Sequence, residues 1–371
     1  MALCHEWLSD RHGSEKTFQA MAEALPDADL HALTWNRDRV PFDRPVATTA
    51  LDRLGPLRDR RDLLLPVMPL AWRYSTRRRY DVVVTSSHAC AKGFRPGRAA
   101  LHLCYCYTPL RYVWFSGVDR RGPIGPAQRL AARGLRAWDR GSARWVDEFA
   151  AISGAVRDRI RDVYGRPARV IHPPVDTDFF TPAPEPVRPG FALAVSRFVP
   201  YKRLDLAVRA CRAAGCPLVV AGAGPEEGRL RHLAAVLKAD VTFVIGPSDE
   251  ALRELYRTAS ALVFPAEEDF GIVAVEAQAC GTPVVALAAG GSLDTVQPGR
   301  TGVLVRTTDE AEWAAAVDQA LRSGTEVDAC RAHALSFSGS RFRAQLRDWV
   351  ASSAAGRGLR PSPVSPADAS P

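Results

Sequence analysis

The sequence lacks the features that mark several common classes of protein. No stretch approaches about 18 consecutive uncharged apolar residues, and the first ten residues contain no basic segment followed by an apolar one. None of the eight cysteines belongs to a Cys-x-x-Cys pair, and most stand in apolar runs. These absences argue against a membrane-spanning chain, an export signal, a zinc ribbon and a disulfide framework. We therefore expect a cytoplasmic protein with reduced, buried thiols, in which any membrane contact is peripheral.

Lysine is scarce, with four residues against 45 arginines, and the net charge of +8 is unevenly distributed. Residues 1–172 contain 29 basic and 18 acidic side chains, whereas residues 173–371 contain 20 and 23. The excess therefore lies in the first half and predicts an anionic partner there: a membrane surface, nucleic acid or a phosphorylated ligand. With 47% hydrophobic and 24% charged residues the chain is globular, and 371 residues are too many for one ordinary core.

Short β-rich runs alternate with helical periodicity, which predicts parallel α/β units. The expected strands are 81–85, 100–105, 148–152 and 169–171 in the first half, and 191–196, 217–221, 241–245, 261–264, 283–287 and 302–305 in the second. The expected helices of the second half are 203–214, 226–238, 249–259, 271–280 and 309–322. Continuous apolar strands are buried on both faces, so we predict two Rossmann-like domains, each a doubly wound parallel sheet.

A proline-rich stretch separates the two domains. We place the first domain at 1–172, the linker with its six prolines at 173–190, and the second domain at 191–338. A C-terminal helix at 339–354 is expected to return to the first domain, and 355–371 has the composition of a disordered tail. Because ligands bind at the carboxyl ends of parallel strands, we expect the two domains to face a central cleft.

The segment 261–286 contains the most informative pattern. An acidic loop follows a strand, and Glu276 is the only charged side chain between Phe270 and Leu293. A carboxylate in so apolar a helix needs a partner, which is either an arginine in a core salt bridge or a hydroxylated ligand such as a ribose. The free amides of Phe270, Gly271 and Ile272 at the helix start, beside Glu268, are typical of an anion site.

Two cations follow the first strand of the second half. Arg197 and Lys202 bracket a turn into a helix, where positive charge is unfavourable unless an anion is bound. A diphosphate therefore fits better than a solvated basic helix start, because both side chains can donate charge-assisted hydrogen bonds to it. Gly222, in a short glycine-rich turn after the next strand, is either a simple turn residue or the edge of a nucleotide site.

Taken together, these segments resemble the retaining glycosyltransferases of family 4, which have the two-domain GT-B fold. The resemblance runs from about His5 to Trp349, and Glu268 and Glu276 stand in the family's E-x7-E spacing within EDFGIVAVEAQACGTPVVA. SRFVPYKRLDLAV, SSHACAKG, YTPLRYVW and VIHPPVDTDFF are most similar to bacterial mannosyltransferases that assemble O-antigen and capsule units on lipid carriers.

The resemblance implies a role for each of these residues. Glu276 would hold the ribose hydroxyls of a nucleotide-sugar, and Glu268, with the amides of Phe270 and Gly271, would hold the transferred hexose. Arg197 and Lys202 would neutralise the leaving diphosphate. We expect no metal and no cofactor, because these cations and the helix amides supply the positive charge that a divalent ion would otherwise supply.

The first half contributes three further candidates. His88 follows a predicted strand and either contacts an acceptor hydroxyl or phosphate, or is a structural imidazole. The amide of Gly13 could face a phosphate, although the resembled proteins have two glycines here and His12 replaces the first. Where they have a histidine near the 6-hydroxyl of the donor hexose, this chain has Tyr107, which can still donate a hydrogen bond.

The basic excess lies in two stretches, Arg53–Arg79 and Arg111–Arg144, each with eight arginines and two aspartates. Leucines interleave with the arginines of the first stretch, a pattern that favours peripheral contact with anionic lipid at the inner face of the cell membrane, or else an arginine-rich solvated surface. No nucleic-acid-binding module accompanies the charge, so we do not expect nucleic acid.

The sequence thus predicts a retaining, metal-independent transferase that moves a hexose, specifically mannose from GDP-mannose, to a lipid-linked or other hydroxyl acceptor in cell-surface glycan assembly. A transferase that uses a UDP- or dTDP-sugar and a small-molecule aglycone is the first alternative. A sugar-nucleotide epimerase or phosphorylase of the same fold, and a non-catalytic nucleotide-sugar-binding module, are the others.

Overall fold

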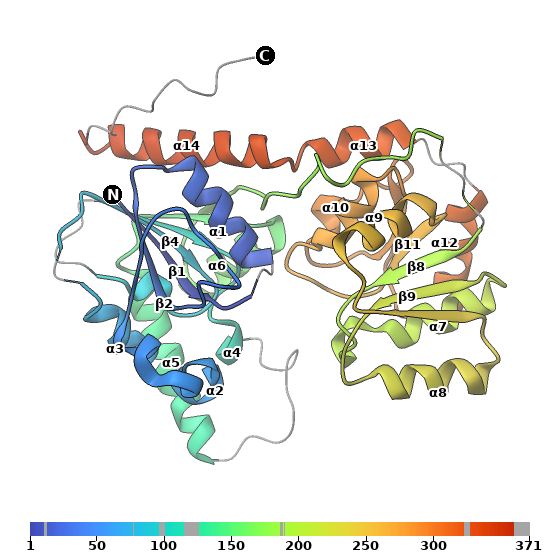
Figure 1. Cartoon of the computed structure of the whole chain (residues 1–371), viewed down its shortest axis with the longest axis horizontal. Helices are drawn as coiled ribbons and strands as arrows, with labels where there is room; N and C mark the ends of the chain where they lie inside the picture. The colour runs from blue at the N-terminus through green and yellow to red at the C-terminus, as the bar shows by residue number, and fades with distance from the viewer. Residues whose placement is uncertain are drawn as a thin grey trace. The chain divides into compact units, whose positions relative to one another are not determined.

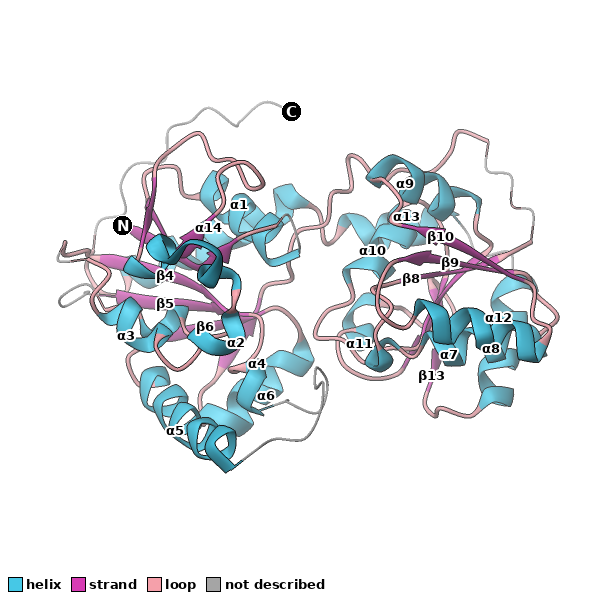
Figure 2. Cartoon of the chain, turned by 60° about the horizontal axis from the view of Figure 1, so that its bottom comes forward, coloured by secondary structure: helices cyan, strands magenta, loops and turns pink. Residues whose placement is uncertain are grey.

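The computed structural model describes residues 1–10, 13–76, 78–95, 101–114, 126–185, 188, 190–322 and 327–359, with side chains omitted at 61–62 and 126–129. The described chain forms two compact units, each with a parallel sheet covered by helices (Figures 1 and 2). The first unit comprises residues 1–152 and 156–171 together with the chain from Phe342 onward. The second comprises residues 153–155 and 172–341.

The first unit contains a seven-stranded parallel sheet in the order β3-β2-β1-β4-β5-β6-β7 within the described residues. Its strands are β1 (Ala2–Leu8), β2 (Asp29–Trp35), β3 (Val46–Thr48), β4 (Val82–Ser87), β5 (Leu101–Cys106), β6 (Glu148–Ala151) and β7 (Ala168–Val170). The order reverses between β1 and β4, so the loops that leave these two strands diverge at their carboxyl ends.

Helices cover both faces of this sheet (Figure 1). The helices are α1 (Gly13–Ala24), α2 (Arg61–Leu64), α3 (Met68–Arg73), α4 (Arg111–Trp114), α5 (Pro126–Ala143), α6 (Gly154–Tyr164) and α14 (Gly339–Ala355), with 3-10 turns η1 (Ala50–Asp59) and η2 (Ala91–Gly93). On α14, Phe342 packs 5.7 Å from the ring of Tyr105, and Trp349 donates to Glu148 at 2.9 Å. The C-terminal helix is therefore bound to the first unit through its own buried aromatic residues.

The second unit contains a six-stranded parallel sheet in the order β10-β9-β8-β11-β12-β13 within the described residues. Its strands are β8 (Ala192–Val195), β9 (Leu218–Gly222), β10 (Val241–Ile245), β11 (Ala261–Phe264), β12 (Val284–Leu287) and β13 (Gly302–Val305). The helices are η3 (Pro200–Lys202), α7 (Leu204–Ala213), α8 (Glu227–Leu237), α9 (Asp249–Thr258), α10 (Ile272–Ala279), α11 (Ser292–Thr295), α12 (Glu310–Arg322) and α13 (Val327–Leu335). Here the order reverses between β8 and β11.

The prediction of two doubly wound parallel α/β domains is confirmed. All six strands predicted for the second unit are present within one or two residues of their expected ends. In the first unit the strand list omitted β1, β2 and β3. The first two of these carry ionisable side chains at buried positions, His5 and Glu6 in β1 and His31 in β2, which interrupt the apolar runs used to find strands.

The cysteines agree with the expectation of buried thiols. All eight are buried and none forms a disulfide. Burial raises the pKa of Cys4, Cys90 and Cys211, so these thiols stay protonated. Among the described residues, no helix combines the length and apolar character needed to cross a bilayer.

Candidate functional site

The strongest candidate site lies where the strand order of the second sheet reverses. The chain leaves β8 toward Arg197 and η3, and leaves β11 toward Glu268 and α10, so both loops diverge from neighbouring strands at their carboxyl ends. In open α/β sheets this is where ligands usually bind. The predicted site residues of the second half therefore occupy one edge of one sheet.

Lys202 and Glu268 form an ion pair across this position. Lys202 is 9% exposed, and its side chain also lies near the ring of Tyr201, 5.0 Å from the ring centroid. Arg203, the next residue, has a left-handed φ of 52°, which is uncommon for a side chain larger than glycine. The turn thus holds the ammonium group of Lys202 against the carboxylate of Glu268. At this position an anion could pair with the lysine and a hydroxyl could donate to the glutamate.

Arg197 lies on the same loop but is exposed, and it donates to the hydroxyl of Tyr201 at 2.9 Å. The structure therefore positions the two predicted cations differently. Lys202 is held by Glu268, whereas Arg197 extends from the surface and can swing onto a phosphate as a planar fork.

The start of α10 has the geometry of an anion site. Gly271 precedes the helix with φ 85° and ψ 59°, and no side chain caps the first amides. A Cβ at Gly271 would lie 3.1 Å from the ring of Phe264, so a larger residue would meet both strain and crowding. The predicted amides at 270–272 thus stand at an uncapped helix start beside Glu268, where the helix dipole favours negative charge.

Glu276 lies one turn further along α10 and is 9% exposed. Its Oε2 accepts a hydrogen bond from the buried hydroxyl of Tyr256 at 3.0 Å. Burial and the neighbouring carboxylate raise the pKa of Tyr256, so its phenol remains a hydrogen-bond donor. A neutral tyrosine therefore donates to the Glu276 carboxylate and holds it in a fixed orientation.

Gly222 and Gly224, in and after the end of β9, allow close backbone packing at this edge of the second sheet. A Cβ at Gly222 would lie 1.9 Å from the carbonyl oxygen of Ser196, and one at Gly224 would lie 2.5 Å from that of Phe198. The amide of Phe198 also donates to the carbonyl of Ala223 at 2.8 Å. These glycines let the loop after β9 approach the backbone of the loop that carries Arg197.

Sequence reasoning missed a second glycine pair, Gly290 and Gly291, which follows β12. A Cβ at Gly290 would lie 2.2 Å from the carbonyl oxygen of Glu268, and the amide of Gly291 donates to that same oxygen at 2.8 Å. The pair therefore holds the acidic loop in place. Two adjacent glycines directly after a buried strand were the signal that could have revealed it.

The first unit has a polar cluster at the corresponding edge of its own sheet. The hydroxyl of Tyr107 accepts from Ser86 at 3.0 Å and donates to the carbonyl of Ser14 at 3.1 Å, and Ser86 also contacts His5 Nδ1 at 3.0 Å. Tyr107 thus links β4 and β5 to the first turn of α1. Gly13 begins α1 with no heavy atom within 4 Å of an added Cβ, and His12 lies outside the described residues.

His88 is half-buried at the end of β4, with its ring centroid 4.8 Å from that of Trp7 and 5.9 Å from that of Tyr107. The loop around it is held by a buried acid, Glu6. Its Oε1 accepts from the Ser87 hydroxyl at 3.0 Å and from the amides of Ala89 and Ala91 at 2.8 Å each. Burial raises the pKa of Glu6, although the loop amides oppose this shift.

Lys92, in the same loop, forms a fully buried ion pair with Asp139 of α5. Asp139 also accepts from the Trp114 indole at 2.7 Å and the Tyr164 hydroxyl at 2.8 Å. Burial alone would lower the pKa of Lys92, but attraction to Asp139 outweighs it and raises the pKa, so the lysine is charged. Lys92 therefore has a structural role. Through Asp139 of α5, which also binds Trp114 of α4 and Tyr164 of α6, it connects the His88 loop to these three helices.

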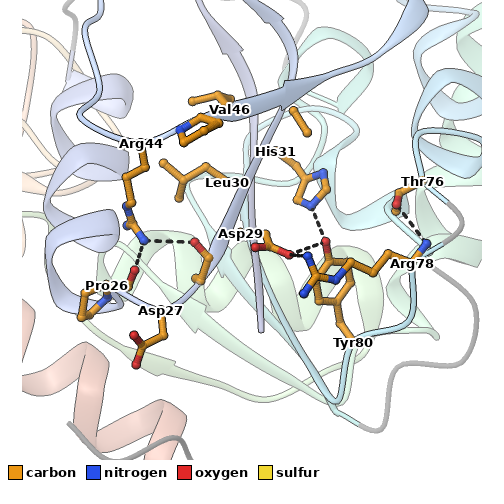
Figure 3. A pocket seen from close by; sticks show the side chains of 13 residues that line it. Pro26, Asp27, Asp29, Leu30, His31, Arg44, Val46, Thr76, Arg78 and Tyr80 are labelled. Atoms are coloured by element: carbon orange, nitrogen blue, oxygen red, sulfur yellow. Dashed lines mark hydrogen bonds and ion pairs between the residues drawn. The ribbon is translucent and has the colours of Figure 1, made fainter. Parts of the chain in front are cut away.

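A pocket of about 490 Å³ lies at the opposite, amino-terminal edge of the first sheet (Figure 3). Asp29 accepts from the Tyr80 hydroxyl at 2.8 Å and pairs with Arg78 at 2.6 Å, and Tyr80 contacts His31 at 3.0 Å. Arg44 donates to main-chain carbonyls, including that of Ala22 at 2.6 Å. Asp29 therefore serves an ion pair and a hydrogen bond within the protein, and the described residues contain no group of three possible metal ligands.

Comparison with known proteins shows which sequence families each part of the chain is similar to. Residues 176–335 match the sequence family "Glycosyl transferases group 1", and residues 11–179 match "Glycosyltransferase Family 4". The fold is that of the GT-B glycosyltransferases. The two matches together span both units, and the predicted resemblance to family 4 is confirmed at this level.

Solved GT-B structures share the fold over nearly the whole chain. A sucrose-phosphate synthase from Thermosynechococcus elongatus aligns with a TM-score of 0.74 at 20% identity, covering 96% of this chain and 100% of the other. The Anabaena protein HepE in complex with UDP and glucose aligns with a TM-score of 0.69 at 19% identity, covering 95% and 100%.

Curated relatives are closer in sequence but match only part of this GT-B chain. The D-inositol 3-phosphate glycosyltransferase of Mycobacterium bovis (strain BCG / Pasteur 1173P2) is 37% identical over 206 residues, or 49% of this chain and 43% of that protein. The chain therefore spans less than half the length of the curated relatives it matches. The name of these relatives indicates an inositol phosphate glycosyltransferase, and mannosyl transfer does not appear in it.

Proposed function

We propose that the chain is a retaining, metal-independent glycosyltransferase that uses a nucleotide-sugar donor. The observation that carries this proposal is the Lys202–Glu268 pair beside the uncapped start of α10, at the strand-order reversal of the second sheet. A cation and free amides suit a diphosphate, and a carboxylate suits sugar hydroxyls.

Each residue has a defined part in the proposed reaction. Lys202, Arg197 and the α10 amides stabilise the negative charge that grows on the diphosphate as the bond between sugar C1 and phosphate oxygen breaks. Glu268 binds hexose hydroxyls. The acceptor hydroxyl attacks C1 on the face that the phosphate leaves, and its proton passes to the departing phosphate oxygen.

Glu276 binds the ribose, and Tyr256 holds its carboxylate in orientation. In the first unit, His88 contacts the acceptor hydroxyl, and the amide of Gly13 contributes to phosphate binding. We propose that the reaction takes place on the cytoplasmic side of the cell membrane and needs no cofactor.

For the donor and acceptor, we keep the sequence-based choice of mannose from GDP-mannose and a lipid-linked acceptor. A second candidate is transfer from a UDP-sugar to a small polyol phosphate. Two names among the comparisons favour it, a neighbour bound to UDP and glucose and the inositol phosphate glycosyltransferase relatives.

The test is a panel of GDP-, UDP- and dTDP-sugars, scored first by thermal shift and then by transfer to candidate acceptors. We expect one nucleotide class to raise the melting temperature of the wild-type protein and neither Lys202→Ala nor Glu276→Gln to respond. Lys238→Ala is the matched control, since Lys238 is exposed at the end of α8. Full transfer activity in Lys202→Ala would contradict the proposed role of Lys202 in donor binding.

The same panel separates the remaining alternatives. Conversion of the donor to another sugar nucleotide without an acceptor would show an epimerase. Release of sugar phosphate would show a phosphorylase, and tight binding with no turnover would show a binding module. Activity that persists in EDTA and a product with the donor's anomeric configuration, measured by NMR, are the results expected for a metal-independent retaining transferase.

A further inference from the structure

The exposed apolar side chains of the first unit are concentrated in one region. Leu63 is 56% exposed, Leu70 57%, Tyr74 76% and Leu130 70%, values typical of polar surface residues. The remaining large apolar residues with such exposure in the described part of this unit belong to the same elements. The full set, which we call the apolar layer, is Leu54, Leu57, Leu63, Val67, Leu70, Tyr74, Tyr112 and Leu130.

These residues lie on or directly next to the helical segments η1, α2, α3, α4 and α5. The inward side chains of these segments, among them Leu64, Met68, Trp72, Val113 and Leu135, share a single core cluster beneath the sheet. Figures 1 and 2 both show α2, α3 and α5 gathered at one side of the first unit. Because one set of side chains is buried, the leucines between them face solvent.

The structure thereby divides the arginine- and leucine-rich segment that the sequence presented as one pattern. Leu64, Met68 and Trp72 are core residues, while Leu63 and Leu70 are surface residues. Gly55, with φ 56°, interrupts η1, so the exposed leucines are carried by several short helices in place of one amphipathic helix.

Exposed positive charge is abundant on the same elements. Arg53, Arg60, Arg73 and Arg79 are exposed in the same segment, where exposed Arg78 is paired with Asp29, and Arg133, Arg140 and Arg144 are exposed on or next to α5. Arg73 lies beside the ring of Tyr74, 5.9 Å from its centroid. Exposed acid is sparse among the described side chains of this layer, where Asp139 is buried and Asp59 is exposed.

We propose that the apolar layer and its arginines form a docking surface for an anionic lipid membrane. The leucines enter the boundary between headgroups and acyl chains, while the arginines lay their stems along the apolar surface and pair with lipid phosphates. This surface rests on the proposed function, because it would bring the enzyme to a membrane that contains a lipid-linked acceptor. Binding of the surface to the membrane does not itself require catalysis.

Two other occupants fit these observations less well. A second copy of the chain in a two-fold dimer would bring the same arginines of both copies together, where like charges repel. Nucleic acid would satisfy the arginines, but the aliphatic side chains would gain nothing from contact with phosphates and would remain in water.

The test is co-sedimentation of the full chain with vesicles of phosphatidylcholine alone or with phosphatidylglycerol added, and no donor present. We expect binding to the anionic vesicles only, at least a tenfold loss of affinity in Leu63→Ser/Leu70→Ser, and a similar loss in Arg53→Glu/Arg60→Glu/Arg73→Glu. Raising the salt concentration from 50 to about 500 mM should weaken binding, because exposed charges are screened.

Matched controls come from the second unit. Val236→Ser/Ile245→Ser removes exposed apolar residues there, and Arg300→Glu/Arg306→Glu/Arg322→Glu reverses exposed arginines, so both variants should bind vesicles like the wild type. Donor thermal shifts in every variant report the proposed function separately. If the donor shift is lost while vesicle binding persists, only the proposed function fails.

Four outcomes would contradict the proposed membrane-docking surface. The first is no binding to anionic vesicles. The second is equal binding by the apolar-layer variants and the second-unit controls. The third is a dimer in sedimentation velocity that Leu63→Ser/Leu70→Ser converts to monomer. The fourth is salt-sensitive binding to duplex DNA as tight as that to vesicles.

Discussion

Each unit buries one lysine against a carboxylate, and the two pairs differ in their surroundings. The side chains of Lys92 and Asp139 in the first unit are 2% and 0% exposed, and Asp139 also accepts from Trp114 and Tyr164. In the second unit the side chain of Lys202 is 10% exposed and that of Glu268 is 23% exposed. The buried pair, whose aspartate also accepts two side-chain hydrogen bonds, stabilises the fold. The partly exposed pair can separate, so that its lysine or its glutamate contacts a ligand.

The largest expected effect separates these two pairs. Lys92→Met leaves the carboxylate of Asp139 buried without its cation, which should cost about 3–5 kcal/mol of the free energy of unfolding. That is a large share of the stability of an ordinary domain. Lys202→Met should leave the melting temperature almost unchanged but reduce the transfer rate by about 10²–10³-fold. Urea titration and a donor-transfer assay measure the two effects.

A double substitution sharpens this contrast. Replacing Asp139 with leucine in the Lys92→Met background removes the orphaned charge and should recover part of the lost stability. Recovery will be incomplete because the Trp114 indole and the Tyr164 hydroxyl lose their acceptor. If Lys92→Met is as stable as the wild type, the pair does not organise the first unit.

The next effect concerns Glu6, which holds the loop around His88. Glu6→Ala removes the acceptor of the Ser87 hydroxyl and of two buried amides, so we expect a loss of about 3 kcal/mol in unfolding free energy. Glu6→Gln keeps an acceptor oxygen and, because burial favours the neutral acid, should cost about 1 kcal/mol or less.

The imidazole signals of His88 provide the second measurement for Glu6. In Glu6→Ala we expect their NMR shifts to move, since the loop on both sides of His88 loses its anchor. Equal stability of the alanine and glutamine variants would show that the three hydrogen bonds contribute little. Glu254→Gln, on the exposed face of α9, is the matched substitution in the second unit.

The third expected effect is a loss of stability of the first unit in mild acid. Burial lowers the pKa of His31 and of His102 to about 4, although nearby aspartates oppose the shift. Between about pH 6.5 and pH 4 the unfolded chain binds protons that the folded unit does not. Stability should therefore fall as pH decreases through this window, by up to about 3 kcal/mol for each histidine.

Tryptophan fluorescence can follow this acid effect selectively, because seven of the eight tryptophans belong to the first unit and Trp313 is in α12 of the second. His102→Gln should flatten the pH dependence, whereas His232→Gln, at an exposed position of α8, should not. A fluorescence transition that does not depend on pH between 7 and 4.5 would contradict the assigned pKa values.

The second unit could be predicted from sequence because its strands are uninterrupted apolar runs and its polar site residues stand just beyond their ends. The sequence placed Arg197, Lys202 and Glu268 in loops at this edge of the sheet, whereas the pairing of Lys202 with Glu268 and the support of the acidic loop by Gly290 and Gly291 needed the structure. In the first unit, by contrast, several buried polar residues, among them His5, Glu6 and His31, lie inside the strands. Glu6 looks like a surface residue in the sequence, and only the loop folded over it reveals a buried acceptor.

The smallest effect concerns Tyr107, which stands where the resembled proteins have a histidine. Its hydroxyl already accepts from Ser86 and donates to the carbonyl of Ser14. Tyr107→Phe removes both bonds but keeps the ring, so we expect a loss of about 1–2 kcal/mol in unfolding free energy. If the hydroxyl acts mainly as a link between α1 and the sheet, KM for the donor should change less than twofold. An increase in KM of tenfold or more with unchanged stability would instead make Tyr107 a sugar contact, and would extend the donor-binding chemistry of the second unit to a residue of the first.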